Sequence, residues 1–233
     1  MSARKSPQRA RQCLSTPARH WSVVYTAASE STGCHTPAAA TGTTRSTESA
    51  ERACGWAGSL PTAPRFAELL ERLGADGAAH YRQYAAEAGS AADAAFNGKW
   101  YLRALYADGE ALGGGERIDS VAQSWAVLSG FGSETRAASA MDSALFRLWD
   151  REHRLIRLLD PPYSDRESSP GYITGYGEGF RENGGQYTHG AIWLAIAALR
   201  LGRSAEGTAM LETLLPETPE ERIYQAEPFV LPA

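Results

Sequence analysis

Residues 181–202 read RENGGQYTHGAIWLAIAALRLG, in which a polar, glycine-rich stretch runs directly into an apolar one. The apolar residues after Gly190 recur at helical spacing and predict a helix with His189 at its start. Backbone N–H groups at a helix start and an imidazole are donors that can converge on an anion, and Arg181 stands beside them. The pattern favours an anion-binding site at this helix start, and a surface or capping histidine is the alternative interpretation.

Helical spacing extends outward from this stretch in both directions. Residues 64–89 predict two successive helices, with Gly74 and Gly89 as their ends. Residues 153–159 (HRLIRLL) are β-like, and a long polar loop follows them. Further helical segments are expected near residues 118–130, 133–150, 187–202, 204–216 and 218–227. The chain is therefore expected to be mostly helical, with antiparallel helix pairs and long polar loops on one side.

Two of these helices carry start signals. Asp119 or Ser120 would lie in the first turn of one helix, where the helix dipole stabilises a carboxylate. Residues 133–136 (SETR) open another with a Ser-x-x-Arg start instead of a full capping box. Trp125 and Trp193 lie on apolar helical faces and are expected to be ordinary core residues.

Helix pairs of this kind fit two architectures. One is an α-solenoid of tetratricopeptide type, and the other is part of an (α/α) barrel whose loops meet over a central cleft. The sequence has no fixed repeat of about 34 residues, which counts against the solenoid. Loops longer than a connection requires usually carry function, so the polar loops are the first place to look for a site.

Composition limits the class of protein. The chain has 233 residues, 43% of them hydrophobic, and a formal net charge of −4, which does not suggest a nucleic-acid partner. It contains neither an apolar run of about 18 residues nor a secretory h-region, so we expect no membrane segment and a cytoplasmic location. The spacing of Cys13, Cys34 and Cys54 matches neither zinc pairs nor a redox motif, and no metal site is expected.

The first 60 residues differ in character from the rest. They are rich in Ser, Thr, Ala, Arg and Pro and show neither helical nor strand periodicity. We predict that residues 1–60 form a low-complexity, disordered segment and that residues 61–233 form the folded domain.

Aromatic and charged side chains gather in the polar segments of the folded part. Sugars are bound by this mixture, because aromatic rings cover their C–H faces while carboxylates and amides bind the hydroxyl groups. The residues concerned include Trp100, Tyr101, Asp119, Gln123, Tyr176, Arg181, Glu182 and His189.

Three stretches together resemble the glycoside phosphorylases of glycoside hydrolase family 94, formerly glycosyltransferase family 36, and especially the phosphorylase-like region of cyclic β-1,2-glucan synthases. They are RIDSVAQSWAVLSG (117–130), LLDPPYSDRESSPGYITGYGEGFRENGGQYTHGAIWLAIAALRLG (158–202) and YQAEPFVLPA (224–233). The resemblance implies an all-α (α/α)6 barrel, of which residues 61–233 would form part. It also implies reversible, inverting phosphorolysis of a β-glucosidic bond.

The resemblance assigns roles to particular residues. His189 matches the phosphate-binding histidine of the family motif, while Tyr176, Arg181 and Glu182 match positions that line the sugar subsites. Gln123 is a weaker, inferred member of the substrate-binding group. The implied partners are a β-glucan or glucooligosaccharide and phosphate or glucose 1-phosphate, with phosphate as co-substrate and no cofactor.

The sequence departs from the family pattern at the catalytic acid. The family's general acid is an aspartate in a G-[ST]-G-D-W-N-D-G motif, which is not found before Pro61, so no catalytic residue is assigned and the chain is expected to be inactive. Thr41-Gly42-Thr43-Thr44 can be regrouped, one base out of frame, as GAC TGG AAC GAC, which encodes Asp-Trp-Asn-Asp. We therefore hypothesise that residues from about 31 to 59 are an out-of-frame translation. A non-catalytic carbohydrate-binding pseudoenzyme and a helical interaction scaffold remain alternatives.

Overall fold

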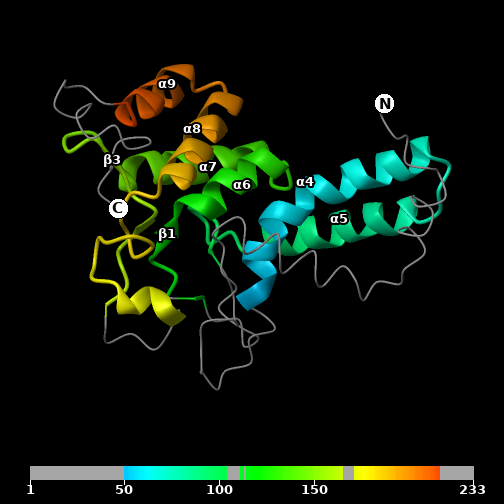
Figure 1. Ribbon diagram of the computed structural model, residues 1–233, viewed down its shortest axis with the longest axis horizontal. Helices are drawn as coiled ribbons and strands as arrows, with labels where there is room; N and C mark the ends of the chain where they lie inside the picture. The colour runs from blue at the N-terminus through cyan, green and yellow to red at the C-terminus, as the bar shows by residue number, and fades with distance from the viewer. Residues whose placement is uncertain (1–49, 104–110, 113, 165–170, 216–233) are drawn as a thin grey trace, which may run out of the picture.

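The computed structural model describes residues 50–103, 111–112, 114–164 and 171–215. The elements, in order, are α4 (Ala50–Arg72), α5 (Ala78–Asp93), β1 (Ile118–Asp119), α6 (Ser120–Ser129), α7 (Glu134–Arg147), β2 (Trp149–Asp150), β3 (Leu155–Ile156), β4 (Leu159–Asp160), the 3₁₀ helix η2 (Gly171–Gly175), α8 (Thr188–Arg200) and α9 (Ser204–Thr213). The described part is mostly helical, as predicted (Figure 1). The predicted disorder of residues 1–49 and the predicted helix at 218–227 lie outside the described residues.

Helices α4 and α5 lie side by side as a hairpin (Figure 1). Gly74, with a φ of +60°, follows the end of α4 as predicted. The prediction that Gly89 ends the second helix is wrong, because α5 continues to Asp93 with Gly89 on its buried face. A glycine inside a helix costs about 1 kcal/mol relative to alanine, which the burial of neighbouring apolar side chains can offset.

The first helix is also longer than its periodicity indicates. It begins at Ala50, upstream of the expected start near residue 64, and contains both Pro61 and Pro64. Neither the domain division at residue 60 nor the frame hypothesis is decided by this helix, so both stay predictions.

Helix α8 lies between α6 and α9 and contacts both of them (Figure 1). Its inner face is fully buried at Leu194, Ala195, Ala197 and Ala198. Small residues on this face allow the neighbouring helices to approach closely, and burial of apolar surface stabilises the packing. Larger members of the same core are Met141, Leu145, Leu148, Ile156 and Met210.

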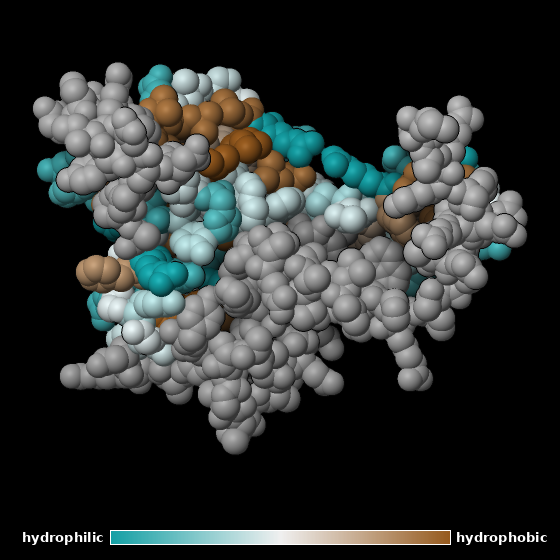
Figure 2. All heavy atoms as spheres, viewed as in Figure 1, coloured by the Kyte–Doolittle hydropathy of each residue, from teal (hydrophilic) through white to brown (hydrophobic). Residues whose placement is uncertain are grey.

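The opposite side of α8 carries an apolar stripe of Ile192, Ile196 and Leu199, which are 37%, 42% and 37% exposed. These residues are three or four positions apart and so lie on one helical face. Figure 2 shows hydrophobic side chains gathered over α8 and α9 on the visible surface.

Both predicted helix starts are confirmed. Asp119 precedes α6, and its Oδ1 accepts hydrogen bonds from the backbone N–H groups of Val121 (2.9 Å) and Ala122 (3.2 Å). Ser133 precedes α7, and its Oγ accepts from the Arg136 N–H at 3.3 Å. Such caps satisfy N–H groups that have no partner within the helix.

The β-like stretch at 153–159 forms short strands, as expected. β1 pairs with β4 in antiparallel fashion, with Ile118 opposite Asp160, and β2 pairs with β3, with Trp149 opposite Ile156. These pairs hold the chain where the polar loop that leads to α8 begins. Residues at the end of that loop return to the same place, because the Leu158 N–H donates to the Gly185 carbonyl at 2.8 Å. No helix within the described ranges is long and apolar enough to cross a membrane.

Candidate functional site

Asn183 anchors the loop that precedes α8. Its side chain is fully buried, and Nδ2 donates to the carbonyl oxygens of Tyr163 (2.9 Å) and Tyr176 (2.8 Å). Its Oδ1 accepts a hydrogen bond from the Tyr163 N–H at 2.7 Å. One amide side chain therefore joins three segments of the backbone, which fixes Tyr176 relative to the start of α8.

The next three residues of the motif pack against the strands. Gly184 has a φ of +92°, and a Cβ added there would lie 2.9 Å from Pro162 Cγ. The carbonyl of Gly185 accepts from the Leu158 N–H, and Gln186 Oε1 accepts from the Ile156 N–H, both at 2.8 Å. Only glycine combines this backbone angle with so close an approach, so the GGQ part of the motif serves the fold.

A tight turn at residues 177–183 directs the side chains of Arg181 and Glu182 to different environments. It is closed by hydrogen bonds from Phe180 N–H to the Gly177 carbonyl (3.0 Å) and from Asn183 N–H to the Phe180 carbonyl (2.9 Å). Arg181 adopts a left-handed φ of +47° within this turn. As a result, the side chain of Arg181 is 59% exposed while that of Glu182 is 9% exposed.

Four side chains connect this turn to the start of α8. The Arg181 guanidinium lies 5.0 Å from the centre of the Tyr176 ring, and its Nε lies 3.7 Å from Glu182 Oε2. The Tyr187 hydroxyl donates to Glu182 Oε1 at 3.3 Å. Burial, followed by the nearby Glu182 carboxylate, raises the pKa of Tyr187. The tyrosine hydroxyl therefore keeps its proton, and remains a donor, at neutral pH.

His189 is the second residue of α8 and is half-buried. Its ring packs edge to face with Tyr187, at 4.5 Å between ring centres, and with Trp193, at 4.8 Å. Trp193 in turn packs edge to face with Trp125 at 5.3 Å. The imidazole is thus held between two aromatic rings beside the helix start.

The expectation that Trp125 and Trp193 are ordinary core residues needs correction. Both are partly buried and pack with Tyr187 against the buried pair Val121 and Leu158. They lie at the edge of the core, where the Trp193 ring also contacts His189. Their apolar helical spacing indicated burial correctly, but it could not show which polar residue they support.

Gln123 lies apart from this group. It is fully buried, and its Oε1 accepts from the Tyr101 N–H while its Nε2 donates to the Tyr101 carbonyl, both at 2.8 Å. Nε2 also donates to the Asp119 carbonyl at 2.9 Å. These contacts join the start of α6 to the segment around Tyr101. They give Gln123 a role in the scaffold, and its assignment to substrate binding stays a prediction.

The structure thus brings together Tyr176, Arg181, Glu182 and His189, which were all predicted site residues, and adds Tyr187. Sequence reasoning missed Tyr187 as a site residue, although it lies between two candidates in the motif. Its signal was its place directly before a helix start, where a residue with a capping side chain would be usual. Tyr187 makes no side-chain cap, which leaves its hydroxyl and ring for Glu182 and His189.

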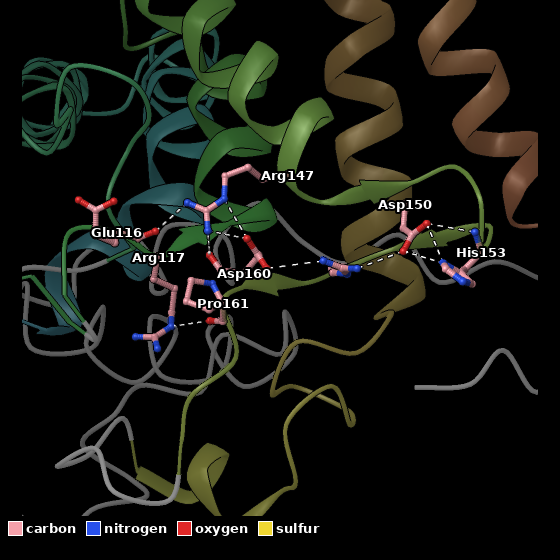
Figure 3. A network of polar contacts seen from close by, with 8 residues as sticks. Glu116, Arg117, Arg147, Asp150, His153, Asp160 and Pro161 are labelled. Atoms are coloured by element: carbon pink, nitrogen blue, oxygen red, sulfur yellow. Dashed lines mark hydrogen bonds and ion pairs between the residues drawn. The ribbon is translucent and has the colours of Figure 1, made fainter.

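A second polar network holds the beginning of the loop in place (Figure 3). Arg147 donates to Asp160 and to the Glu116 carbonyl, the latter at 2.8 Å. Arg117 donates to the Pro161 carbonyl at 2.7 Å, and its guanidinium lies 3.8 Å from the centre of the Tyr163 ring. Since Tyr163 is also bound by Asn183, this network is connected through Tyr163 to the loop that carries the candidate site.

Comparison with known proteins identifies the family. The sequence profile of the glycosyl hydrolase 94 superfamily, catalytic domain, matches residues 53–233. The chain is 40% identical over 149 residues to the cyclic beta-(1,2)-glucan synthase NdvB of Rhizobium meliloti (strain 1021), an alignment that covers 60% of this chain and 5% of that protein.

Two phosphorylases are also similar. The solabiose phosphorylase of Paenibacillus borealis is 32% identical over 127 residues, which cover 53% of this chain and 16% of the relative. The N,N'-diacetylchitobiose phosphorylase of Vibrio proteolyticus is 28% identical over 174 residues, which cover 70% of this chain and 22% of the relative. The chain therefore spans less than a quarter of each of these relatives. Because the family profile matches most of its length, including the loop and helix that carry the site, the chain belongs to the glycosyl hydrolase 94 superfamily through its catalytic domain.

Proposed function

We propose that this chain is part of a carbohydrate-active enzyme of β-glucan metabolism, in which it binds sugar and phosphate next to each other. The reaction would be inverting phosphorolysis, or transfer, at β-1,2-glucosidic bonds. The observation that carries the proposal is an unbroken path of contacts. It runs from Arg181 to Glu182 (3.7 Å), from Glu182 to Tyr187 (3.3 Å) and from Tyr187 to His189 (4.5 Å). The name of one relative, a cyclic beta-(1,2)-glucan synthase, supports a β-1,2-glucan substrate, and the names of the two phosphorylases support the use of phosphate on a carbohydrate.

The roles within the site follow from its chemistry. Glu182 accepts hydrogen bonds from sugar hydroxyl groups, Arg181 donates to sugar oxygens, and the ring of Tyr176 covers a C–H face. His189, at the start of α8, donates to phosphate together with backbone N–H groups. An inverting reaction needs a nucleophile on the face of the sugar opposite the acid, and phosphate takes that place without a cofactor.

We further propose that the helices of this chain form part of an (α/α)6 barrel and that the site works in the cytoplasm. The hairpin of α4 and α5 and the packing of α8 between α6 and α9 are compatible with such a barrel. The apolar stripe of Ile192, Ile196 and Leu199 is the kind of surface that a further helix would cover.

Catalysis by this chain alone is not expected. No aspartate motif of the general-acid type was found in its sequence, and loss of a general acid typically costs about 10²- to 10⁴-fold in rate. Sequencing the encoding DNA tests the frame hypothesis, which fails if the codons for residues 41–44 cannot be regrouped to GAC TGG AAC GAC.

Calorimetric titration with a β-1,2-glucooligosaccharide and, separately, with inorganic phosphate tests the proposed binding. Both ligands should bind, and His189→Ala should weaken phosphate binding by about tenfold or more. His80→Ala is the matched control, because His80 is an exposed histidine on α5, where it contacts Tyr81. A helical interaction scaffold would bind neither ligand, and that result would contradict the proposal.

A turnover assay separates binding from catalysis. The chain is incubated with the oligosaccharide and phosphate, and release of glucose 1-phosphate is measured. We expect binding without release, as for a carbohydrate-binding pseudoenzyme. Release at an ordinary enzymatic rate would show that the acid is supplied in some other way, and would contradict the proposed inactivity.

A further inference from the structure

Tyr187 lies between Glu182, on the proposed sugar side of the candidate site, and His189, on the proposed phosphate side. Its backbone is fixed by α8. It is the residue before the helix, with φ −103° and ψ 103°, and its carbonyl accepts a hydrogen bond from the Ala191 N–H at 3.0 Å. An aromatic side chain offers no cap to the free N–H groups of a helix start. The presence of tyrosine here therefore has to be explained by its other contacts.

The hydroxyl of Tyr187 acts on the sugar side. It donates to Glu182 Oε1 at 3.3 Å, while no described residue donates a hydrogen bond to the buried Glu182 Oε2. One oxygen of the carboxylate is thus fixed by the protein, and the other still has its hydrogen-bonding capacity. A buried carboxylate oxygen without a hydrogen bond is costly, and a hydroxyl donor would relieve that cost.

The ring of Tyr187 acts on the phosphate side. It packs edge to face with His189 at 4.5 Å and an interplanar angle of 76°. Trp193 packs on His189 in the same way, at 4.8 Å and 78°. Between them the two rings restrict the rotation of the imidazole, which reduces the entropy lost when its N–H is directed at an anion.

We infer that Tyr187 is a positioning residue with two separable tasks: its hydroxyl orients Glu182 for the sugar, and its ring orients His189 for phosphate. This inference rests on the proposed function and adds to it a physical link between the two substrates. Since each task uses a different part of one side chain, two substitutions can remove them one at a time.

Tyr187→Phe removes the hydroxyl and keeps the ring. In titrations of the whole chain, it should weaken binding of a β-1,2-glucooligosaccharide by about three- to tenfold, and leave binding of inorganic phosphate within about twofold. Tyr187→Leu removes both contacts and should weaken both ligands. If Leu at this position prevents folding, Trp193→Leu serves in its place, because it removes a ring from His189 without touching Glu182, and it should weaken phosphate binding alone.

A ligand-free measurement accompanies the titrations. The NMR signals of the His189 imidazole should move in Tyr187→Leu and Trp193→Leu and remain almost unchanged in Tyr187→Phe. If Tyr187→Phe weakens both ligands equally or neither, or if it moves the His189 signals as much as Leu does, the inference is wrong. If the unchanged protein binds neither ligand while the His189 signals respond as expected, the proposed function fails and the positioning of His189 by the ring stands.

Discussion

Arg147 donates two hydrogen bonds to a single oxygen of Asp160, with Nε 2.8 Å and Nη2 2.5 Å from Oδ2 (Figure 3). Arg147 is the last residue of α7, and Asp160 is the last residue of β4. Their side chains are 25% and 20% exposed. The pair therefore joins the end of a helix to the point at which the polar loop leaves the strand.

We predict that Arg147→Ala lowers the free energy of unfolding by about 1–3 kcal/mol, because it leaves the Asp160 carboxylate partly buried with fewer donors. Urea denaturation followed by circular dichroism measures the change. Arg82→Ala is the matched control, since Arg82 forms an ion pair of 2.8 Å with Glu71 whose side chains are 48% and 50% exposed. It should cause a clearly smaller loss, and equal losses for the two variants would contradict the importance of Arg147.

Gly184→Ala should be more damaging than the same change at another glycine of similar backbone angle. Gly184 and Gly202 have φ values of +92° and +77°, but an added Cβ meets Pro162 Cγ at 2.9 Å only at Gly184, and nothing within 4 Å at Gly202. We expect a loss of about 1 kcal/mol for Gly202→Ala and about 2–4 kcal/mol for Gly184→Ala. Thermal unfolding of both variants tests the difference, and similar melting temperatures would refute the steric argument.

Asp150 gives a prediction about pH. The pKa of Asp150 is lowered, first by the backbone N–H of His153 and then by the His153 side chain. A lowered folded-state pKa contributes stability that is present above the unfolded carboxyl pKa of about 4. This stability is lost as the pH falls through the folded-state pKa. Asp150→Asn should therefore be less stable than the unchanged protein at pH 7, and the difference should shrink in acid.

His153→Ala separates the two causes of the lowered Asp150 pKa, the backbone N–H and the side chain of His153. It retains the backbone N–H, which donates to Asp150 Oδ1 at 3.0 Å, and removes only the ring. Its loss of stability at pH 7 should therefore be smaller than that of Asp150→Asn. Denaturant midpoints measured from pH 3 to pH 7 provide the comparison, and a stability difference independent of pH would rule out the titration of Asp150 as its source.

The exposed stripe on α8 predicts self-association. Contiguous apolar surface favours aggregation of an isolated chain, so we expect poor solubility when this chain is expressed alone. Ile192→Lys combined with Ile196→Lys should increase the monomer fraction severalfold in size-exclusion chromatography. Gln83→Lys combined with Ala86→Lys adds the same charge at exposed positions on α5 and should have little effect. A cooperative, monomeric melt of the unchanged chain would contradict the expectation.

The helix starts were predicted correctly because they depend on residues that are close together in the sequence. Asp119 and Ser133 cap helices through contacts two or three positions away, so their residue type and place are enough to identify them. Gly89 was misread because α5 is buried by distant parts of the chain, α4 and Phe131, which a local pattern does not include. Gln123 bonds to Tyr101, which is 22 residues away, so its buried role could not be read from its surroundings in the sequence.

In the candidate site, contacts between residues only a few positions apart were also missed. Arg181, Glu182 and His189 were found through a family motif, yet the contact of Tyr187 with both Glu182 and His189 was not. That contact depends on the path of the loop, which turns through a left-handed φ at Arg181 and again at Gly184. Backbone reversals of this kind are only weakly encoded by residue type when the residue is not glycine.

Residues 181–189 contain two groups of side chains with different roles, and this affects how related sequences are interpreted. Asn183, Gly184 and Gln186 hold the backbone, whereas Arg181, Glu182, Tyr187 and His189 form the contact path of the site. A protein could keep the first group and lose the second, and would then retain the shape of the loop while losing the side chains of the proposed sugar and phosphate contacts. Under the proposed function, loss of ligand binding in related sequences should therefore be sought at positions 181, 182, 187 and 189, because Asn183, Gly184 and Gln186 report on the backbone of the loop.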